Sequence, residues 1–360
     1  MEKRVDRALK FLADKTPGKL LIMRNDLGVP CFETHWIERL TQEPVEYFLD
    51  PARVSDVNDE FLRETRGLSN RTMAVDDDAV HTVEVYFSIG SVTSMMCGVR
   101  ATFGSGTGWC EPNMSVSQAM EAIQFNAENP WVRFHDLVIA DMIRKWDGDY
   151  TLSPCFHRSP LDAANGLCGN ELFVDMYDRA EEVLTLIRAC AQWSIALEDH
   201  WAQAHKWPTD LKRGVWGLTL PEGAVFVNGD PVDLISAEHQ QFFDEPSCSL
   251  LFTQTGGGFF HHHALGIRQV GNVAKTQGIL AQNIYTDPKI ETPANQLFRD
   301  EALCEQIVNA SLVAPIHIGD DFLPIIDRLL PILRRGRFIL RQENTETMEG
   351  LLKKLDGLRS

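Results

Sequence analysis

Three consecutive histidines follow three glycines in the stretch "GGGFFHHHALG" at residues 256–266. Side chains two positions apart on a β-strand point the same way, so His261 and His263 share one face and His262 lies on the other. Two imidazoles on one face, joined by a carboxylate from a neighbouring strand, make a three-ligand metal site that leaves a position for water or substrate. Such a set suits zinc or iron(II). The alternative is that the histidines are hydrogen-bonded polar residues or acid/base groups without a metal, and His262 is expected to be a packing residue.

The elements that must position these histidines alternate along the chain. In the last 220 of the 360 residues, short β-prone runs are followed by stretches with helical periodicity. Strand-then-helix repetition implies parallel pairing, and this many units favour a closed (β/α)8 TIM barrel. Six units are clear, and two further strands are candidates at 82–90 and 214–220. The clear strands are expected within 149–157, 224–230, 258–264, 280–285, 313–319 and 337–343.

The first 110 residues do not follow this alternation. We expect residues 1–110 to form helical and loop embellishments over the mouth of the barrel, and residues 111–360 to form the barrel body. The chain is then a single domain of 360 residues. A barrel of this size is within the usual range for one α/β domain.

Active sites of such barrels lie in the loops that follow the carboxyl ends of the strands. This topology places His157, Arg158 and Asp230 around the same mouth as the histidines. Arg158 is the candidate for gripping a substrate anion with two hydrogen bonds, although an arginine after a strand is as often a surface salt-bridge partner. The same rule adds Tyr285, Asp287, His317, Gln342 and Glu343 to the mouth.

Two longer segments carry recognisable motifs. "SPLDAANGLCGNELFVDMYDRAEEVLTLI" (159–187) looks like a G-P-[LF]-x-x-A-x-x-L-x-G segment with its following helix. "FVNGDPVDLISAEHQQFFDEP" (226–246) looks like a D-x-x-x-x-x-S-P-E segment, with Ala237 where proline is usual. With these motifs the chain resembles the uroporphyrinogen decarboxylase superfamily, and its cobalamin-linked methyltransferase branch more than the true decarboxylases. The resemblance spans about residues 145 to 360 and includes the histidine stretch. It implies the same barrel fold.

The chain departs from the true decarboxylases near its beginning. Those enzymes carry an arginine-rich "RQAGR" element that grips the substrate carboxylates, and this sequence has none. The comparable region, "GVPCFETHWIERL" (28–40), offers Glu33, His35 and Glu38 instead. Acids there would repel a tetrapyrrole polycarboxylate, so we do not expect that reaction. We expect this segment to fold over the mouth, with His35 as an acid/base group.

The methyltransferase branch holds zinc with an H-x-C motif on one strand and a cysteine at the end of the last strand. Here His261 and His263 occupy the H-x-C position, and Gln342 or Glu343 stands where the second cysteine would be expected. The resemblance therefore implies a divalent metal, zinc first and iron second, bound by His261, His263 and Glu343. It also implies a corrinoid carried on a separate partner protein, because the chain shows no cobalamin-binding signature of its own.

The leading hypothesis is a metal-dependent methyltransferase or demethylase that moves a methyl group between a small substrate and a corrinoid protein or thiol. The alternative is a decarboxylase or other lyase, in which His261, His263 or His35 act as acid/base groups and Arg158 holds a carboxylate. A third possibility is a non-catalytic binding barrel, since both expected cysteines are replaced.

Composition limits the partners and the compartment. The net charge of −17 argues against nucleic acid or an anionic membrane as a partner, because both favour a basic surface. No stretch approaches the roughly 20 apolar residues that a membrane-spanning helix requires. The eight cysteines contain no C-x-x-C pair, which is typical of reduced thiols. The amphipathic N-terminus does not resemble a signal peptide. We therefore expect a cytoplasmic protein.

Overall fold

A parallel sheet of seven strands is the framework of the protein, in the order β1-β13-β12-β11-β10-β9-β6. The computed structural model describes residues 1–24, 32–72, 76–85, 92–104, 107–287, 289–297, 300–342 and 345–359. Five of the six clear strands of the sequence prediction are confirmed, whereas the run expected at 149–157 is divided between a strand of a second sheet and a strand of this one. The strands of the sheet are β1 (Lys19–Arg24), β6 (Phe156–Arg158), β9 (Val225–Asn228), β10 (Gly258–His263), β11 (Ile279–Tyr285), β12 (Ile316–Ile318) and β13 (Arg337–Gln342).

Strand β1 corrects the prediction that residues 1–110 contribute only embellishments. It pairs in parallel with β13 along its whole length, so the N-terminal part of the chain belongs to the sheet itself. Its sequence, KLLIMR, is a nearly continuous apolar run whose last five residues are buried. A strand covered on both faces has no polar alternation, and this one stands apart from the strand-then-helix repetition of the later chain.

The sheet does not close into an eight-stranded barrel within the described residues, because β1 and β6 are its two edges. Residues 76–85 contact β1 near one end and, near the other, the strand that precedes β6 in the chain. The backbone N–H of Asp78 donates to the carbonyl of Ile22 at 2.8 Å, and that of Val85 donates to Ser153 at 2.8 Å. Strand β2 (Thr82–Glu84), from the candidate at 82–90, pairs with β5 (Thr151–Ser153) in a second sheet ordered β2-β5-β7-β8. Residues 86–91 of that candidate lie outside the described residues.

The candidate strand at 214–220 is a hairpin, and its prediction as a barrel strand is wrong. Strands β7 (Arg213–Val215) and β8 (Leu218–Leu220) pair antiparallel. Trp216 and Gly217 between them both have positive φ, 46° and 85°. Two consecutive residues with positive φ form the tight turn that suits a two-residue hairpin. The turn reverses the chain in the middle of the apolar run.

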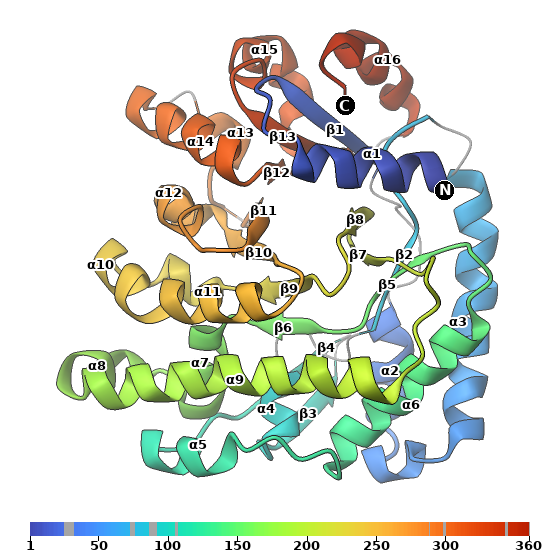
Figure 1. Cartoon of the computed structure of the whole chain (residues 1–360), viewed down its shortest axis with the longest axis vertical. Helices are drawn as coiled ribbons and strands as arrows, with labels where there is room; N and C mark the ends of the chain where they lie inside the picture. The colour runs from blue at the N-terminus through green and yellow to red at the C-terminus, as the bar shows by residue number, and fades with distance from the viewer. Residues whose placement is uncertain are drawn as a thin grey trace.

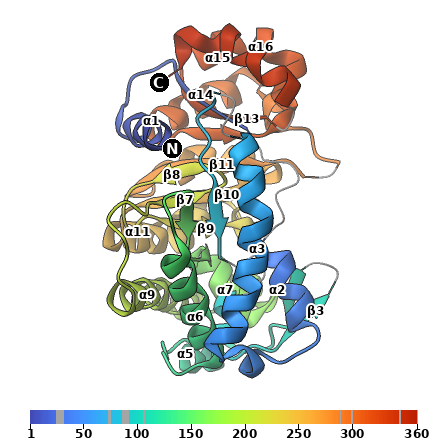
Figure 2. The same cartoon turned by 90° about the vertical axis from the view of Figure 1, so that its right-hand side faces the viewer.

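Helices follow the strands and cover the outer side of the sheet (Figure 1). The two chain ends lie at the same end of the molecule, and the long helix α3 runs down one side (Figure 2). The helices are α1 (Glu2–Ala13), α2 (Phe32–Leu40), α3 (Pro51–Thr72), α4 (Val92–Met96), α5 (Val116–Ala122), α6 (Pro130–Lys145), α7 (Pro160–Cys168), α8 (Glu171–Asp178), α9 (Ala180–Ala204), α10 (Ala237–His239), α11 (Glu245–Gln254), α12 (Val270–Val273), α13 (Pro293–Gln296), α14 (Glu301–Val313), α15 (Ile326–Leu333) and α16 (Thr345–Leu355). A separate hairpin joins β3 (Ala101–Gly104) and β4 (Thr107–Cys110).

Alternation along each strand gives the sheet two different faces. Outward residues such as Leu20, Ile22 and Phe338 are buried in a core that includes side chains of α14, α15 and α16. Inward residues pack against α1 and the β7–β8 hairpin, which cover the amino-terminal half of the inner face of the sheet. These inward residues are Leu21, Met23, Phe156, Phe226, Phe259, Ala281 and Ile339.

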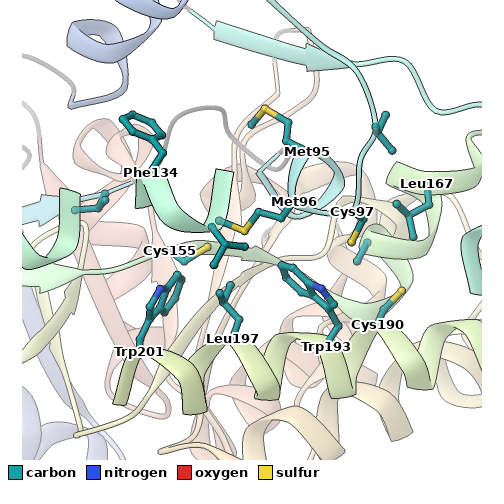
Figure 3. Packing of buried hydrophobic residues seen from close by; sticks show 14 of the residues in the cluster. Met95, Met96, Cys97, Phe134, Cys155, Leu167, Cys190, Trp193, Leu197 and Trp201 are labelled. Carbon is teal, nitrogen blue, oxygen red and sulfur yellow. The ribbon is translucent and has the colours of Figure 1, made fainter. Parts of the chain in front are cut away.

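The long helix α9 contributes a core of its own. Trp193, Leu197 and Trp201 are at helical spacing, are buried, and project toward Met96 and Cys155 (Figure 3). This face packs against neighbouring elements as an ordinary apolar helix face does. No helix in the described part of the chain is long and apolar enough to span a membrane.

Candidate metal-binding and catalytic site

The carboxyl-terminal half of the inward face carries a row of polar side chains. The strand register places one inward polar residue beside the next across five adjacent strands. This polar row consists of Arg158, Asn228, His261, Asn283 and His317. Two residues earlier on four of these strands, the inward residues are apolar: Phe156, Phe226, Phe259 and Ala281. The period-2 geometry of the strands therefore positions a polar layer directly above an apolar one.

The two inward histidines of β10 face each other at the centre of this site. The Nε2 atoms of His261 and His263 lie 3.2 Å apart. Asp230, the first residue after Gly229 at the end of β9, places its Oδ1 3.3 Å from His263 Nε2. Each histidine is also held through its other nitrogen. Nδ1 of His261 is 2.5 Å from Asn283 Oδ1, and Nδ1 of His263 is 2.6 Å from Asp287 Oδ1.

This arrangement fits a divalent metal ion. A tetrahedral ion with bonds of about 2.0–2.1 Å requires ligand atoms roughly 3.3 Å apart. The donor atoms of Asp230, His261 and His263 all lie within 4.8 Å of one another, and the two separations above match the requirement. Histidine ligands usually donate their second ring N–H to a carboxylate or carbonyl oxygen, as the contacts to Asn283 and Asp287 allow. The donor set is therefore a candidate metal site.

The electrostatic environments of the two histidines differ strongly. Burial, reinforced by neighbouring His263, lowers the pKa of His261 to about 4. Burial also acts to lower the pKa of His263, but the carboxylates of Asp230 and Asp287 outweigh it and raise that pKa to about 9. His261 is therefore neutral at physiological pH and ready to act as a ligand or proton acceptor. A metal ion must displace a proton from His263.

Arg158 joins the polar row as the prediction required. Its Nη1 donates to the backbone oxygen of Asp162 at 3.1 Å and lies 3.3 Å from the Oδ1 of that residue. The other carboxylate oxygen of Asp162 accepts from Asn228 Nδ2 at 3.0 Å. Arg158 is thus connected through Asp162 to Asn228 on β9, the neighbour of β10. Its own strand, β6, lies two positions from the histidine strand β10.

His157 does not join the His261 site. Adjacent residues on a strand face opposite sides, so once Arg158 points inward His157 must point outward. Its Nε2 lies 2.8 Å from Oε1 of Glu198 on α9, and Glu198 accepts a second bond from Arg213 at 2.9 Å. His262 likewise lies on the outward face and is fully buried, and burial lowers its pKa to about 3.

His35 lies in a different group of side chains. Its Nε2 is 3.2 Å from Glu64 of α3, and its ring packs on the edge of Phe61. Its potential ligand atoms converge with those of Glu60 and Glu64, separately from those of Asp230, His261 and His263. The expected approach of His35 to the histidine site is not seen. Glu343, the expected third metal ligand, lies outside the described residues, as does the side chain of Gln342.

Two side chains at the site were missed in the sequence. Asn283 precedes Tyr285 by two positions in "LAQNIY", so strand alternation could have placed it inward. Trp216 gave no such signal, because it lies at the tip of the β7–β8 hairpin. Its ring centroid is 5.1 Å from that of His261, nearly edge to face, and 6.4 Å from that of His317. Trp216 forms the floor beneath the polar row.

No protein-family model matches the chain, and no curated protein matches its sequence. Among solved structures, a methyltransferase from Methanosarcina mazei is similar over 98% of both chains, with 12% sequence identity and a TM-score of 0.59. At this identity the likeness shows a shared fold. Membership of the uroporphyrinogen decarboxylase superfamily, and of its methyltransferase branch, stays a prediction. The chain has an α/β fold built on a parallel sheet, and it shares this fold with a methyltransferase.

Proposed function

We propose that this protein is an enzyme that transfers a methyl group to or from a small substrate with the help of a divalent metal ion. The observation that carries the proposal is the convergence of His261, His263 and Asp230, with both histidines fixed from behind by Asn283 and Asp287. The fold shared with a methyltransferase supports the type of reaction. We further propose that the seven strands belong to a single-domain (β/α)8 barrel, because residues 76–85 hydrogen-bond to the edge strand β1 and to β5, which directly precedes the other edge strand β6 in the chain.

His261, His263 and Asp230 would hold the ion, and Glu343 is a candidate for a further ligand. Asp230 was expected to be catalytic, and its position beside His263 Nε2 favours a ligand role. Two histidines and a carboxylate suit zinc or iron(II), and bind zinc less tightly than cysteine ligands do. When bound, the ion supplies Lewis acidity toward a thiol or toward the heteroatom that carries the methyl group.

The surrounding residues orient this site. Asn283 and Asp287 select which ring nitrogen of each histidine faces the ion, and Trp216 limits the depth of the space beneath them. The proposed methyl carrier is a corrinoid on a partner protein, a proposal supported by the sequence resemblance and by the shared fold. The substrate would approach from the exposed side, where Tyr285 is 55% exposed next to His263.

Metal analysis tests the metal site directly. We would purify the wild type, His263→Ala, Asp230→Asn and His262→Ala without oxygen, supply zinc or iron(II), and measure bound metal after gel filtration. Wild type and His262→Ala should hold one equivalent, because His262 faces away from the site. His263→Ala should hold none and Asp230→Asn less than wild type, with unchanged circular dichroism. Wild-type protein without metal would refute the metal site.

Methyl transfer is tested with methylcobalamin as a stand-in for the carrier protein and 2-mercaptoethanol as acceptor. The methyl group leaves cobalt for the thiolate sulfur, so that cob(I)alamin and a methyl thioether form in equal amounts. We expect zinc-loaded wild type to consume methylcobalamin faster than His263→Ala does, and mass spectrometry to detect the thioether. Equal rates for wild type, variant and buffer would count against methyl transfer.

A decarboxylase or other lyase is the second candidate. It is favoured by the neighbouring pKa values of about 4 for His261 and about 9 for His263, which is how a proton acceptor and a proton donor are commonly paired. Wild-type protein that binds no metal, yet releases carbon dioxide from small carboxylates in a His263-dependent manner, would support this alternative. Activity that requires the metal and a methyl donor would exclude it.

A further inference from the structure

Part of the guanidinium of Arg158 has no hydrogen-bond partner within the described residues. Its side chain is 16% exposed. The two bonds to Asp162 both come from Nη1, whereas Nε is buried and has no hydrogen-bond partner within the described chain. Guanidinium groups bind carboxylates best when two parallel N–H donors reach both oxygens. The geometry therefore leaves donor capacity on Arg158 that its ion pair with Asp162 does not use.

A hydroxyl group beside Arg158 comes from α4, the helix that contacts both β6 and α7. Ser94 is fully buried, and its hydroxyl has no hydrogen-bond partner in the described parts of the structure. Gly166 of α7 shows how near Ser94 lies to the arginine. A Cβ at Gly166 would collide with both Ser94 Oγ and Arg158 Nη1. Glycine at this position allows the two polar groups to approach the same point.

Unsatisfied buried donors are unfavourable, typically by about 1–3 kcal/mol each, so they usually mark a place where a ligand or water completes the bonding. A guanidinium and a hydroxyl are donors that suit an oxyanion. Asp162, the acid beside them, is itself held by Asn228 of the polar row. An anion bound by Arg158 would therefore lie on the same row as His261, with β9 between them.

We propose that Arg158 and Ser94 form an anion subsite that binds the carboxylate of a small substrate. This rests on the proposed function, because it names the substrate class of the same site. Two strand spacings separate β6 from β10, about 10 Å of backbone distance that inward side chains shorten from both sides. A short molecule with a carboxylate at one end and a methylated oxygen, nitrogen or sulfur at the other spans this gap. Its methylated end lies toward His261 and His263.

Calorimetric titration with two matched probes tests the subsite. Methoxyacetate carries a carboxylate and a methoxy group, and 2-methoxyethanol replaces the carboxylate with a neutral hydroxymethyl group. Both would be titrated into metal-free, chelator-dialysed protein and into zinc-loaded protein. The variants are Arg158→Gln, Arg158→Lys and Ser94→Ala. Arg179→Gln serves as control, because Arg179 also forms an ion pair within four residues but lies at the junction of α8 and α9, with its side chain 35% exposed.

We expect wild type and Arg179→Gln to bind methoxyacetate with or without zinc, and more tightly than 2-methoxyethanol. Arg158→Gln should weaken methoxyacetate binding by about ten- to a hundred-fold, the usual loss for a charge-assisted bond, and Ser94→Ala by a few-fold. Arg158→Lys should retain part of the affinity, because it keeps the charge and loses the planar fork. If Arg158→Gln fails to fold, Arg158→Lys and Ser94→Ala decide the result.

Several results would overturn the subsite. These are no binding of methoxyacetate by wild type, binding that Arg158 and Ser94 variants leave unchanged, or binding only to zinc-loaded protein, which would make the carboxylate a metal ligand. Tighter binding of inorganic phosphate than of methoxyacetate would overturn the assignment to carboxylates. The subsite and the metal site fail separately. Arg158-dependent binding by a protein that takes up no metal would refute the proposed function and leave the subsite standing.

Discussion

Replacing Asp287 tests whether a carboxylate that contacts His263 strengthens metal binding at the proposed site. Its Oδ1 lies 2.6 Å from His263 Nδ1, on the side of the ring away from His261. Asp287→Asn keeps the shape and an oxygen that can accept the same hydrogen bond, but removes the negative charge. We expect the variant to fold normally and to bind zinc more weakly than wild type.

The size of the effect follows from the distance. An ion about 2 Å beyond His263 Nε2 would lie roughly 7 Å from the Asp287 carboxylate. Two unit charges at that separation interact by about 2 kcal/mol at an effective dielectric constant of 20. The ion carries two charges, but it replaces the proton that His263 holds at neutral pH, so the net change is about one unit charge and the figure stands. About 2 kcal/mol corresponds to an affinity roughly 30-fold weaker, within the range typical of such supporting residues.

Competition with a chromophoric chelator at constant pH measures this affinity for wild type and Asp287→Asn. Asp199→Asn is the matched control, because Asp199 is exposed on α9 and its replacement changes the net charge equally. The control should bind zinc as wild type does. If Asp287→Asn stays within about three-fold of wild type, the carboxylate does not support the metal, and the reasoning from the carboxylate–histidine pair is refuted.

Three further outcomes are expected, each measured by urea unfolding. Trp216→Gly should be destabilised by about 2 kcal/mol, because loss of ring packing exceeds the relief of the strained φ of 46°. Gly266→Ala should lose about 1–3 kcal/mol, because its Cβ collides with Asp233, whereas Gly319→Ala, with open space around it, should not. Burial lowers the pKa of His135 to about 4. Its contribution of about 3 kcal/mol to the free energy of unfolding is therefore present above pH 6.5 and is lost as the pH falls toward 4. His135→Gln should flatten this dependence of stability on pH.

Most strands of the sheet were predictable because each combines an apolar run with a following helix. This pattern located six strands of the large sheet, with β10 and β13 nearly at their observed boundaries. The six are β6, β9, β10, β11, β12 and β13. Strand β1 was missed because it comes after a helix in a region that lacks the repetition. The segment at 214–220 misled for a related reason. Its composition is that of a strand, and only the positive φ of Trp216 and Gly217 shows that the chain turns back there.

The site was predictable within one strand and not between strands. Alternation on β10 alone showed that His261 and His263 share a face, and the Nε2 separation of 3.2 Å agrees with it. On β6, alternation shows that His157 and Arg158 point in opposite directions, but not which of them points inward. That choice is made by packing, since Phe156 fits the apolar layer beneath the polar row and Glu198 of α9 offers His157 a partner.

The register between neighbouring strands determines which polar residues lie side by side. The sequence of a single strand does not determine this register. Asn283 lies opposite His261 because β11 pairs with β10 in that register, and a shift by one residue would present Ile284 or Gln282 instead. Asn283 also contacts His317 Nδ1 at 2.6 Å, so the same register connects a third strand to the proposed metal ligands. The register is in turn held by the apolar layer below, where Phe259 adjoins Phe226 and Ala281. Packing of that buried layer is therefore what sets the distances among the polar groups of the candidate site.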